Sequence, residues 1–452
     1  MDIYKTSERK HRFSTNVYQG DFSRYGRDQL VSGRQNRARQ HNLNAPYSDL
    51  EVSLPPVPDA IRIYEDYQGC FALEKDIPGM LRSINESKMS RIVRQAYKRD
   101  HFRIQGWRVR KLEGGTSNPL SMSIYRFEGV GCERNEWLDW SILLKIIRSP
   151  ANLGYDDSGV DEGNAGEQSR WNYWKRELLV YQSHWLEGLP EGIRAPACYE
   201  AQEAAGNIGG IWLEDGRDSY SGNWPLARYA LAARHLGRLN GIYISRRELP
   251  TFPWLSRQRT RQWLQSIPWQ VFPWDHPLVW QQFTNPSVNT FRCFLQEHER
   301  FLEELDQLPK TINLGDTNPA NFISRHLPHN QEQTLAMNWS QTGVEPLGDD
   351  LGQLVYGTYL SLKGYKLRDI SETLFTSYVN GLQDSGCHFD IPLVRFGYTA
   401  SAAFRMGLSK LVQLEEQLKH EDYSLHPTYH TTVTEPFESF MASEAYRLLG
   451  EI

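Results

Sequence analysis

The sequence predicts a two-lobed α+β fold in which a small lobe built on one sheet precedes a large, mostly helical lobe. Three observations support this prediction. Strand-like segments fill much of residues 101–147 and 196–214, one helix with an apolar stripe lies between them, and helical periodicity dominates from about residue 226 onward. The length of 452 residues also favours two or three packed units over one.

The first segment is a polar arm. Lys and Arg outnumber Asp and Glu over residues 1–52, and apolar periodicity is weak there. This composition is typical of a solvated arm, with docking or inhibition as the alternative role. The proline-rich stretch from Leu54 to Pro58 stiffens the chain. Residues 1–59 are therefore predicted to be a basic arm followed by a Pro-rich linker.

Residues 60–215 are predicted to form the small lobe and the hinge that follows it. A helical leader spans about 60–99, with apolar residues at loosely helical spacing. Five strands follow, and one main helix, whose stripe runs from Trp174 to Trp185, separates the third strand from the fourth. The strands are expected to form an antiparallel sheet. Their predicted ranges are 101–112, 120–127, 137–147, 196–202 and 208–214.

Residues 216–452 are predicted to form the large lobe. Apolar side chains recur at helical spacing around Tyr229 to Leu236 and again around Phe404 to Leu418. Short polar loops interrupt this pattern between about residues 314 and 350. We expect these loops to carry chemistry, because functional residues are concentrated on loops that a rigid scaffold positions.

Composition excludes several classes of protein. The formal charge of −5 gives no global basic field for nucleic acid, and no apolar run approaches the roughly 20 residues that a membrane span requires. The five cysteines are scattered and never spaced as Cys-x-x-Cys, which argues against a disulfide scaffold or a structural zinc site. The start of the chain lacks the apolar segment of a secretory signal, so we expect a cytoplasmic protein.

A glycine-rich turn is the first motif that could carry chemistry. The turn after the first strand contains two glycines followed by hydroxyl and amide side chains, and such turns let backbone N–H groups approach a phosphate. An ordinary hairpin turn is the alternative interpretation. The residues concerned are Gly114, Gly115, Thr116, Ser117 and Asn118.

The second motif pairs Lys145 with Glu177. Lys145 interrupts the apolar side chains of the third strand, and Glu177 lies in the main helix. A helix carboxylate would offset the desolvation of the lysine and hold its ammonium group for the phosphates of a nucleotide. A snorkelling lysine and a solvated glutamate, beside Lys175 and Arg176, are the alternative.

Two further motifs follow in the large lobe. Asp316 and Asn321 bracket the polar loop Leu314-Gly-Asp-Thr-Asn-Pro-Ala-Asn321, which suits a carboxylate that accepts a hydroxyl proton and an amide that binds a metal. A capped turn is the alternative. The apolar strand Leu335-Ala-Met-Asn338 then ends in a polar residue, and Asp349 and Asp350 come shortly after it.

These motifs, in this order, resemble the aminoglycoside phosphotransferase and choline kinase-like family, whose members have a protein-kinase-like fold. The resemblance runs from about Trp107 to the C-terminal helices. It implies that Gly114 to Asn118 cover the nucleotide phosphates, that Lys145 holds the α- and β-phosphates, and that Glu177 orients this lysine. Asp316 is the implied catalytic carboxylate. The implied hinge residues that meet the adenine are Leu213, Glu214 and Asp215.

The chain departs from the family at two positions. Leu314 stands where the family usually has a histidine that braces the catalytic loop. Asn338 stands where the family has an aspartate that binds Mg²⁺, so the implied metal ligands are Asn321 and Asn338, and loss of a negative charge should weaken metal binding. An engineered inactive variant, a kinase with a weakened metal site and a pseudokinase are the three explanations. The resemblance assigns Asp350 a structural role near the base of the loop.

The predicted function is therefore an ATP- and Mg²⁺-dependent phosphotransferase, a kinase with an alcohol group as acceptor, whose acceptor is a small-molecule hydroxyl. The alternatives are a nucleotide-binding pseudokinase and a kinase acting on Ser or Thr of a peptide. Five tryptophans between Trp254 and Trp280 form either an acceptor cage or a helical core, and the acidic cluster from Glu415 to Asp422 forms either a cation-binding wall or a solvated helix end. No oligomeric state is predicted.

Overall fold

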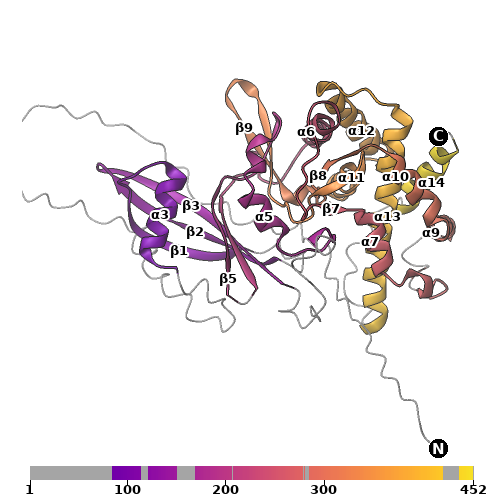
Figure 1. The fold of residues 1–452 in the computed structure, drawn as a ribbon, viewed down its shortest axis with the longest axis horizontal. Helices are drawn as coiled ribbons and strands as arrows, with labels where there is room; N and C mark the ends of the chain where they lie inside the picture. The colour runs from indigo at the N-terminus through magenta and orange to yellow at the C-terminus, as the bar shows by residue number, and fades with distance from the viewer. Residues whose placement is uncertain are drawn as a thin grey trace, which may run out of the picture.

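A computed structural model of the chain places a sheet at one end of the molecule and a body of helices at the other (Figure 1). It describes residues 84–112, 121–149, 168–205, 207–277, 279, 285–420 and 437–450. The predicted arm and linker, and most of the predicted leader, lie outside these residues. In the described ranges, no helix combines the length and apolar character that crossing a membrane requires.

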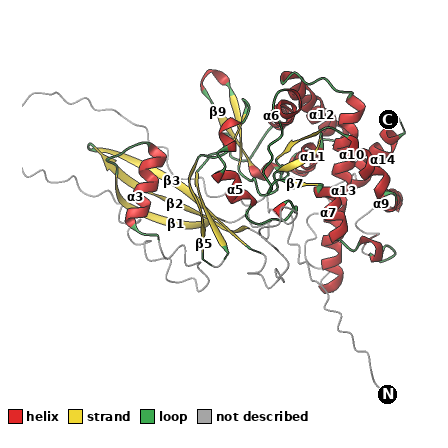
Figure 2. Ribbon diagram, in the orientation of Figure 1, coloured by secondary structure: helices red, strands yellow, loops and turns green. Residues whose placement is uncertain are grey.

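Five antiparallel strands form the small sheet in the order β1-β2-β3-β6-β5. Together with the helices that follow, they confirm the predicted two-lobed α+β fold (Figure 2). The strands are β1 (Arg103–Leu112), β2 (Ser121–Glu133), β3 (Glu136–Arg148), β5 (Cys198–Ala204) and β6 (Ile208–Glu214).

The second strand is longer than predicted. It was expected to end at residue 127, before Gly129 and Gly131, but both glycines lie inside β2. They provide space instead of a turn, since a Cβ atom at Gly129 would lie 2.9 Å from the Cα of Trp107. The turn is formed by Arg134 and Asn135, whose φ angles of 50° and 66° suit a two-residue hairpin.

Helix α3 (Glu86–Tyr97) is the described part of the predicted leader, and it covers one face of the sheet. Asn85 caps it, because its side chain accepts a hydrogen bond of 2.9 Å from the backbone N–H of Lys88. Met89, Ile92 and Val93 are fully buried against the sheet. The aromatic members of this core cluster are Phe102, Trp107, Tyr125, Phe127, Trp140 and Trp212.

Helix α5 (Arg176–Gln182) is the predicted main helix, shortened to seven residues. It packs on β5 and β6 and lies between the sheet and the helical body (Figure 1). A short 3-10 helix (Trp185–Gly188) and strand β4 (Ile193–Arg194) follow it. Strand β4 does not join the small sheet. It pairs in parallel with β10 of the large part, so the chain between α5 and β5 contributes to a second sheet.

The large part is mainly helical, as predicted, but it contains two small sheets with the strand orders β4-β10-β9 and β7-β11-β8. These sheets carry the loops of the candidate site. Its described strands are β7 (Ser256–Arg257), β8 (Lys310–Asn313), β9 (Phe322–His326), β10 (Glu332–Ala336) and β11 (Gly343–Pro346). Its described α-helices are α6 (Leu226–Ser245), α7 (Arg259–Ser266), α9 (Asn285–Gln296), α10 (His298–Gln307), α11 (Asp349–Ser361), α12 (Leu367–Asp384), α13 (Ile391–His420) and α14 (Phe437–Leu449).

Helices α6 and α12 pack closely because each contributes a glycine to the contact. A Cβ atom at Gly237 would lie 2.1 Å from the backbone oxygen of Tyr378. One at Gly381 would lie 2.0 Å from the backbone oxygen of Arg234. Helix α6 also carries Asn240, whose amide donates a 2.6 Å hydrogen bond to the backbone oxygen of Ile312 in β8. The close crossing therefore positions the strand that leads into the candidate site.

Replacing Gly381 by Ala should destabilise the protein by about 1–3 kcal/mol, because two helix backbones must separate to admit the methyl group. Urea unfolding of Gly381→Ala beside the unmodified chain measures this loss. Gly188→Ala is the control, since the nearest atom to its new Cβ is a flexible arginine nitrogen at 3.6 Å. Equal stability of the two variants would contradict the proposed backbone contact.

Candidate active site

Lys145 and Glu177 form a buried ion pair. Lys145 lies on β3 opposite Ile211 of β6, and Glu177 lies in the first turn of α5. The lysine Nζ is 2.8 Å from Oε1 and 2.6 Å from Oε2 of the glutamate, and the two side chains are 6% and 0% exposed. The structure thus brings together the strand lysine and the helix glutamate that the sequence suggested, and burial excludes the solvated alternative.

Arg176, the neighbour of Glu177, is also fully buried. Its described hydrogen bonds all go to backbone oxygens, among them those of Trp254 at 2.7 Å and Ser340 at 2.9 Å. Burial, and then the nearby Arg259, lowers the pKa of Arg176 to about 9. The alternative of a solvated Glu177 beside Lys175 and Arg176 does not hold for Arg176 either, because its side chain is buried. Its other acceptors are the backbone oxygens of Gln168, Arg170 and Trp171.

The loop after β8 carries Asp316 and is shaped by a buried carboxylate. Asp350, at the start of α11, accepts hydrogen bonds of 2.9 Å from the backbone N–H groups of both Leu314 and Gly315. Gly315 has a φ of +80°, and a Cβ atom there would lie 2.3 Å from the backbone oxygen of Gln341. Asp350 therefore holds the loop by its backbone, while the Leu314 side chain is buried in the core.

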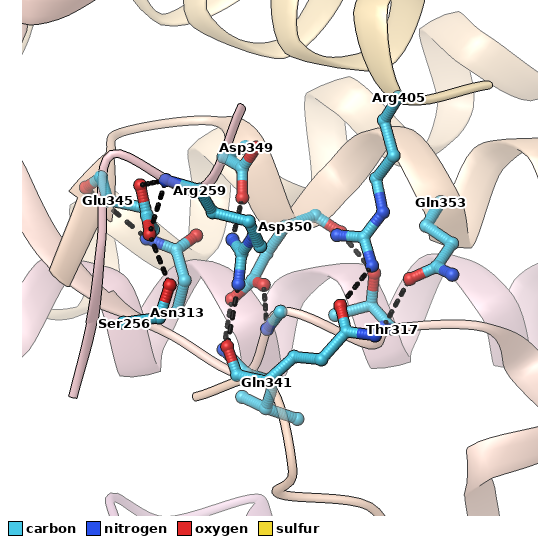
Figure 3. A network of polar contacts seen from close by, with 12 residues as sticks. Ser256, Arg259, Asn313, Thr317, Gln341, Glu345, Asp349, Asp350, Gln353 and Arg405 are labelled. Atoms are coloured by element: carbon cyan, nitrogen blue, oxygen red, sulfur yellow. Dashed lines mark hydrogen bonds and ion pairs between the residues drawn. The ribbon is translucent and has the colours of Figure 1, made fainter. Parts of the chain in front are cut away.

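A polar network lies beneath this loop (Figure 3). Arg259 forms a buried ion pair with Asp349 and donates a 2.7 Å hydrogen bond to the backbone oxygen of Gln341. Glu345 accepts hydrogen bonds from the Ser256 hydroxyl and from the backbone N–H of Arg259. Arg405 of α13 reaches the side chain of Gln341 at 2.7 Å. No pattern in the sequence predicted the roles of Arg259, Glu345 and Arg405, because charges so distant from one another in sequence carry no common signal.

These buried charges shift one another's pKa values. Burial, and then the neighbouring Asp349, raises the pKa of Asp350 to about 6, and burial raises the pKa of Glu345. Burial opposes the charge of Arg259, but Asp349 and then Glu345 outweigh it, so the pKa of Arg259 lies above its ordinary value. Asp350 is thus a carboxylate with two backbone donors in an environment that disfavours its charge.

Asp316 and Asn338 meet at the centre of the site. The amide Nδ2 of Asn338 donates a 2.7 Å hydrogen bond to Oδ2 of Asp316, and the two residues are 7% and 5% exposed. The other carboxylate oxygen, Oδ1, is buried and makes no hydrogen bond to any described residue. Asn321 donates to the backbone oxygen of Asp316 at 3.3 Å. The structure therefore brings together all three side chains that the resemblance assigns to the catalytic loop and metal site.

The segment Asn338–Ser340 links this cluster to the ion pair. The backbone N–H of Trp339 donates to Oε1 of Glu177 at 3.3 Å, and the backbone N–H of Ser340 donates to Oδ1 of Asn338 at 3.2 Å. Arg176 binds the backbone oxygen of Ser340. Through Asn338 and Trp339, this short segment thus contacts both Asp316 and Glu177.

The predicted hinge residues have other partners. Leu213 is buried in β6. Glu214 pairs with Arg194 and Arg325 of the large part. Asp215 pairs with Arg126 at 2.8 Å. These side chains hold the chain between the lobes. The residues of the predicted phosphate turn, Gly114, Gly115, Thr116, Ser117 and Asn118, lie outside the described residues.

The aromatic segment belongs to the core. Trp254, Trp263, Trp269 and Trp274 are each at most 9% exposed and pack in the main hydrophobic cluster, which favours the core over an acceptor cage. Trp280 is not among the described residues. Of the acidic cluster, only Glu415 has a described side chain.

The site offers an oxygen donor that fits one divalent cation. The side-chain carbonyl oxygen of Asn321, whose Nδ2 donates to the backbone oxygen of Asp316, is a donor of the kind that Mg²⁺ takes. The side chain of Asn338 does not fit a second cation, because its oxygen faces the Ser340 N–H. In the part of the chain that the structure describes, no three His, Cys, Asp or Glu side chains cluster as a metal site.

The described residues define a two-lobed α+β protein that joins a buried lysine–glutamate pair to an aspartate loop. No family model and no curated protein matches the sequence. The chain is similar in structure to amicoumacin kinase (13% identity, 81% of this chain and 96% of that chain, TM-score 0.42). It is also similar to aminoglycoside 2′-phosphotransferase-IIIa (11%, 81% and 98%, 0.41) and to a choline kinase from Streptococcus pneumoniae (13%, 81% and 100%, 0.35). These likenesses are remote.

Removing one charge of the buried pair should cost more than removing both. Lys145→Met leaves a buried carboxylate and Glu177→Gln leaves a buried ammonium group, each at about 3–5 kcal/mol. The double variant should lose clearly less than the sum of the two single losses. Urea unfolding of the three variants measures the coupling. Additive losses would show that the two charges do not stabilise each other.

The raised pKa of Asp350 should make stability depend on pH. The folded state binds this proton more tightly than the unfolded chain, whose aspartates titrate near pH 3.9. The tighter proton binding of folded Asp350 therefore contributes fully to the free energy of unfolding below about pH 4. This contribution is lost as pH rises through about 6. In urea unfolding, the free energy of unfolding of the unmodified chain should fall relative to that of Asp350→Asn as pH rises over this range. The exposed Asp369→Asn is the control, and a constant difference for Asp350→Asn would contradict the raised pKa.

Proposed function

We propose that the chain is an ATP- and Mg²⁺-dependent phosphotransferase that moves the γ-phosphate to a hydroxyl group of a small molecule. The observation that carries the proposal is the hydrogen-bonded segment Asn338–Ser340, which contacts both the buried pair and Asp316. A lysine held by a glutamate and a carboxylate held near it are the two groups that phosphoryl transfer requires from a protein.

In this proposal Lys145 binds the phosphates and Asp316 serves the acceptor. The ammonium group is already fixed by Glu177, so it pays little entropy when the nucleotide binds. Oδ1 of Asp316, which has no hydrogen-bond partner among the described residues, accepts the proton of the acceptor hydroxyl. The acceptor oxygen then forms the new bond to the γ-phosphorus while the bond to the β-phosphate oxygen breaks, which leaves ADP.

Asn321 would hold the cation that arrives with the nucleotide. The cation supplies neutralisation of phosphate charge. The backbone between Leu213 and Asp215 and the turn from Gly114 to Asn118 are the proposed contacts for the adenine and the phosphates. A kinase acting on a Ser or Thr side chain of a peptide would use the same groups.

A nucleotide-binding pseudokinase is the second candidate, and Asn338 favours it. This amide replaces a carboxylate at the position where the resemblance places a metal ligand, and its oxygen is engaged by Ser340. Such a protein would bind nucleotide without transferring phosphate to any acceptor. If Asn338→Asp gains transfer activity, the position is a weakened metal site and the pseudokinase is excluded.

Asp316→Asn should lower phosphate transfer by about 100-fold or more, because it removes the proton acceptor, and should change nucleotide affinity little. Lys145→Met should weaken nucleotide binding by about tenfold or more, since a charged hydrogen bond to phosphate is lost. Calorimetric titration with a non-hydrolysable ATP analogue and Mg²⁺ measures binding. ADP formation from ATP, with and without a panel of hydroxyl acceptors, measures transfer.

Each outcome of these measurements assigns a role. Turnover by Asp316→Asn equal to that of the unmodified chain would show that another group accepts the proton. Absence of nucleotide binding by the unmodified chain would reject both candidate functions. Binding without transfer to water or to any acceptor would favour the pseudokinase.

A further inference from the structure

We propose that Asn338 is a positioning residue for Asp316, which it holds through its amide N–H in place of a shared cation. This inference rests on the proposed function of Asp316. Three features of the structure support it: the orientation of the Asn338 amide, the different hydrogen bonding of the two carboxylate oxygens of Asp316, and the attachment of the Asn338–Ser340 backbone to helix α5.

The orientation of the Asn338 amide is determined by its two partners. A backbone N–H can only donate, so the group that faces the Ser340 N–H at 3.2 Å must be the carbonyl oxygen. The NH₂ group then faces Oδ2 of Asp316 at 2.7 Å, and an ionised carboxylate can only accept. Turning the amide over would place two acceptors together at one end and two donors at the other. To reach a cation at Asp316, the amide oxygen must break both hydrogen bonds.

The contact with Asn338 gives the two carboxylate oxygens of Asp316 different hydrogen bonding. Oδ2 is engaged by Asn338, while Oδ1 is buried and has no described hydrogen-bond partner. A carboxylate at position 338 would instead face Asp316 at hydrogen-bond distance, where like charges repel unless a cation or a proton lies between them. The neutral amide supplies its own hydrogen in that place. The geometry of Asp316 therefore requires no cation between positions 316 and 338.

The backbone of the same segment is fixed from the other side. Trp339 donates to Glu177, and Ser340 accepts from the buried Arg176. Because Glu177 and Arg176 are neighbours on α5, the helix holds the segment at two peptide groups, on either side of the one that joins Trp339 to Ser340. The direction of the Asn338 side chain, and through it that of Asp316, is thereby tied to the helix that orients Lys145.

Asn338→Asp tests the inference in the absence of nucleotide. With EDTA, its melting temperature should fall by roughly 4 °C or more below that of the unmodified chain, because two carboxylates now face each other. Mg²⁺ at millimolar concentration should restore most of this loss and should not shift the unmodified chain. Asn318→Asp is the matched control. It adds the same charge to the same loop, and its side chain can still accept the 3.0 Å hydrogen bond from the Ala320 N–H. Its melting temperature should change little and show no response to Mg²⁺.

Binding of Mn²⁺, followed by electron paramagnetic resonance, provides a second readout that loss of packing alone would not produce. Asn338→Asp should bind Mn²⁺ at least tenfold more tightly than the unmodified chain, whereas Asn338→Ala should not. The inference is overturned if Asn338→Asp is as stable as the unmodified chain in EDTA. It is also overturned if the unmodified chain binds Mn²⁺ and Asn338→Ala loses that binding, a comparison that holds even if Asn338→Asp does not fold. No nucleotide or acceptor is present, so these outcomes are independent of whether the chain transfers phosphate.

Discussion

The burial of a full positive and a full negative charge between the sheet and the helical body is the constraint on which the site depends. Lys145 and Glu177 have almost no contact with water, so each must keep the other within hydrogen-bond distance. This requirement fixes the rotation of α5 relative to β3, because only one face of the helix presents Glu177. The groups that contact Glu177, including the backbone N–H of Trp339, are positioned by the same constraint.

A second set of buried charges performs the same task on the other side of the site. Asp350 organises the loop that carries Asp316 through two backbone N–H groups, and Arg259 compensates the carboxylate of Asp349 beside it. Because the loop is held through its backbone, the side chain of Leu314 can pack in the core. This arrangement places several carboxylates in an environment of low polarity, which disfavours their charged forms. The raised pKa of Asp350 is a result of this burial.

Much of the fold could be predicted from the sequence because its elements have local signals. A run of apolar residues interrupted by Lys145 revealed β3, and an apolar stripe revealed the helix with Glu177. The end of β2 was placed too early because Gly129 and Gly131 resemble turn residues. They provide space in a strand, and that use depends on Trp107, which lies far away in sequence. The hydrogen bonds of Arg176 had no local signal, although its place among buried apolar residues of a short helix could have suggested burial.

The pairing of β4 with β10 ties the chain that follows α5 to the large part. Strand β4 follows α5 closely and belongs to a sheet of the large part, and Arg176 ties α5 to Trp254 and Ser340 of the same part. Helix α5 also packs on β5 and β6 of the small sheet, and its Glu177 binds Lys145 of β3. At the end of β6, Arg194 and Arg325 both pair with Glu214. Helix α5 therefore joins the two parts of the molecule, and the Lys145–Glu177 ion pair is one of the contacts that hold the small sheet to the helical body.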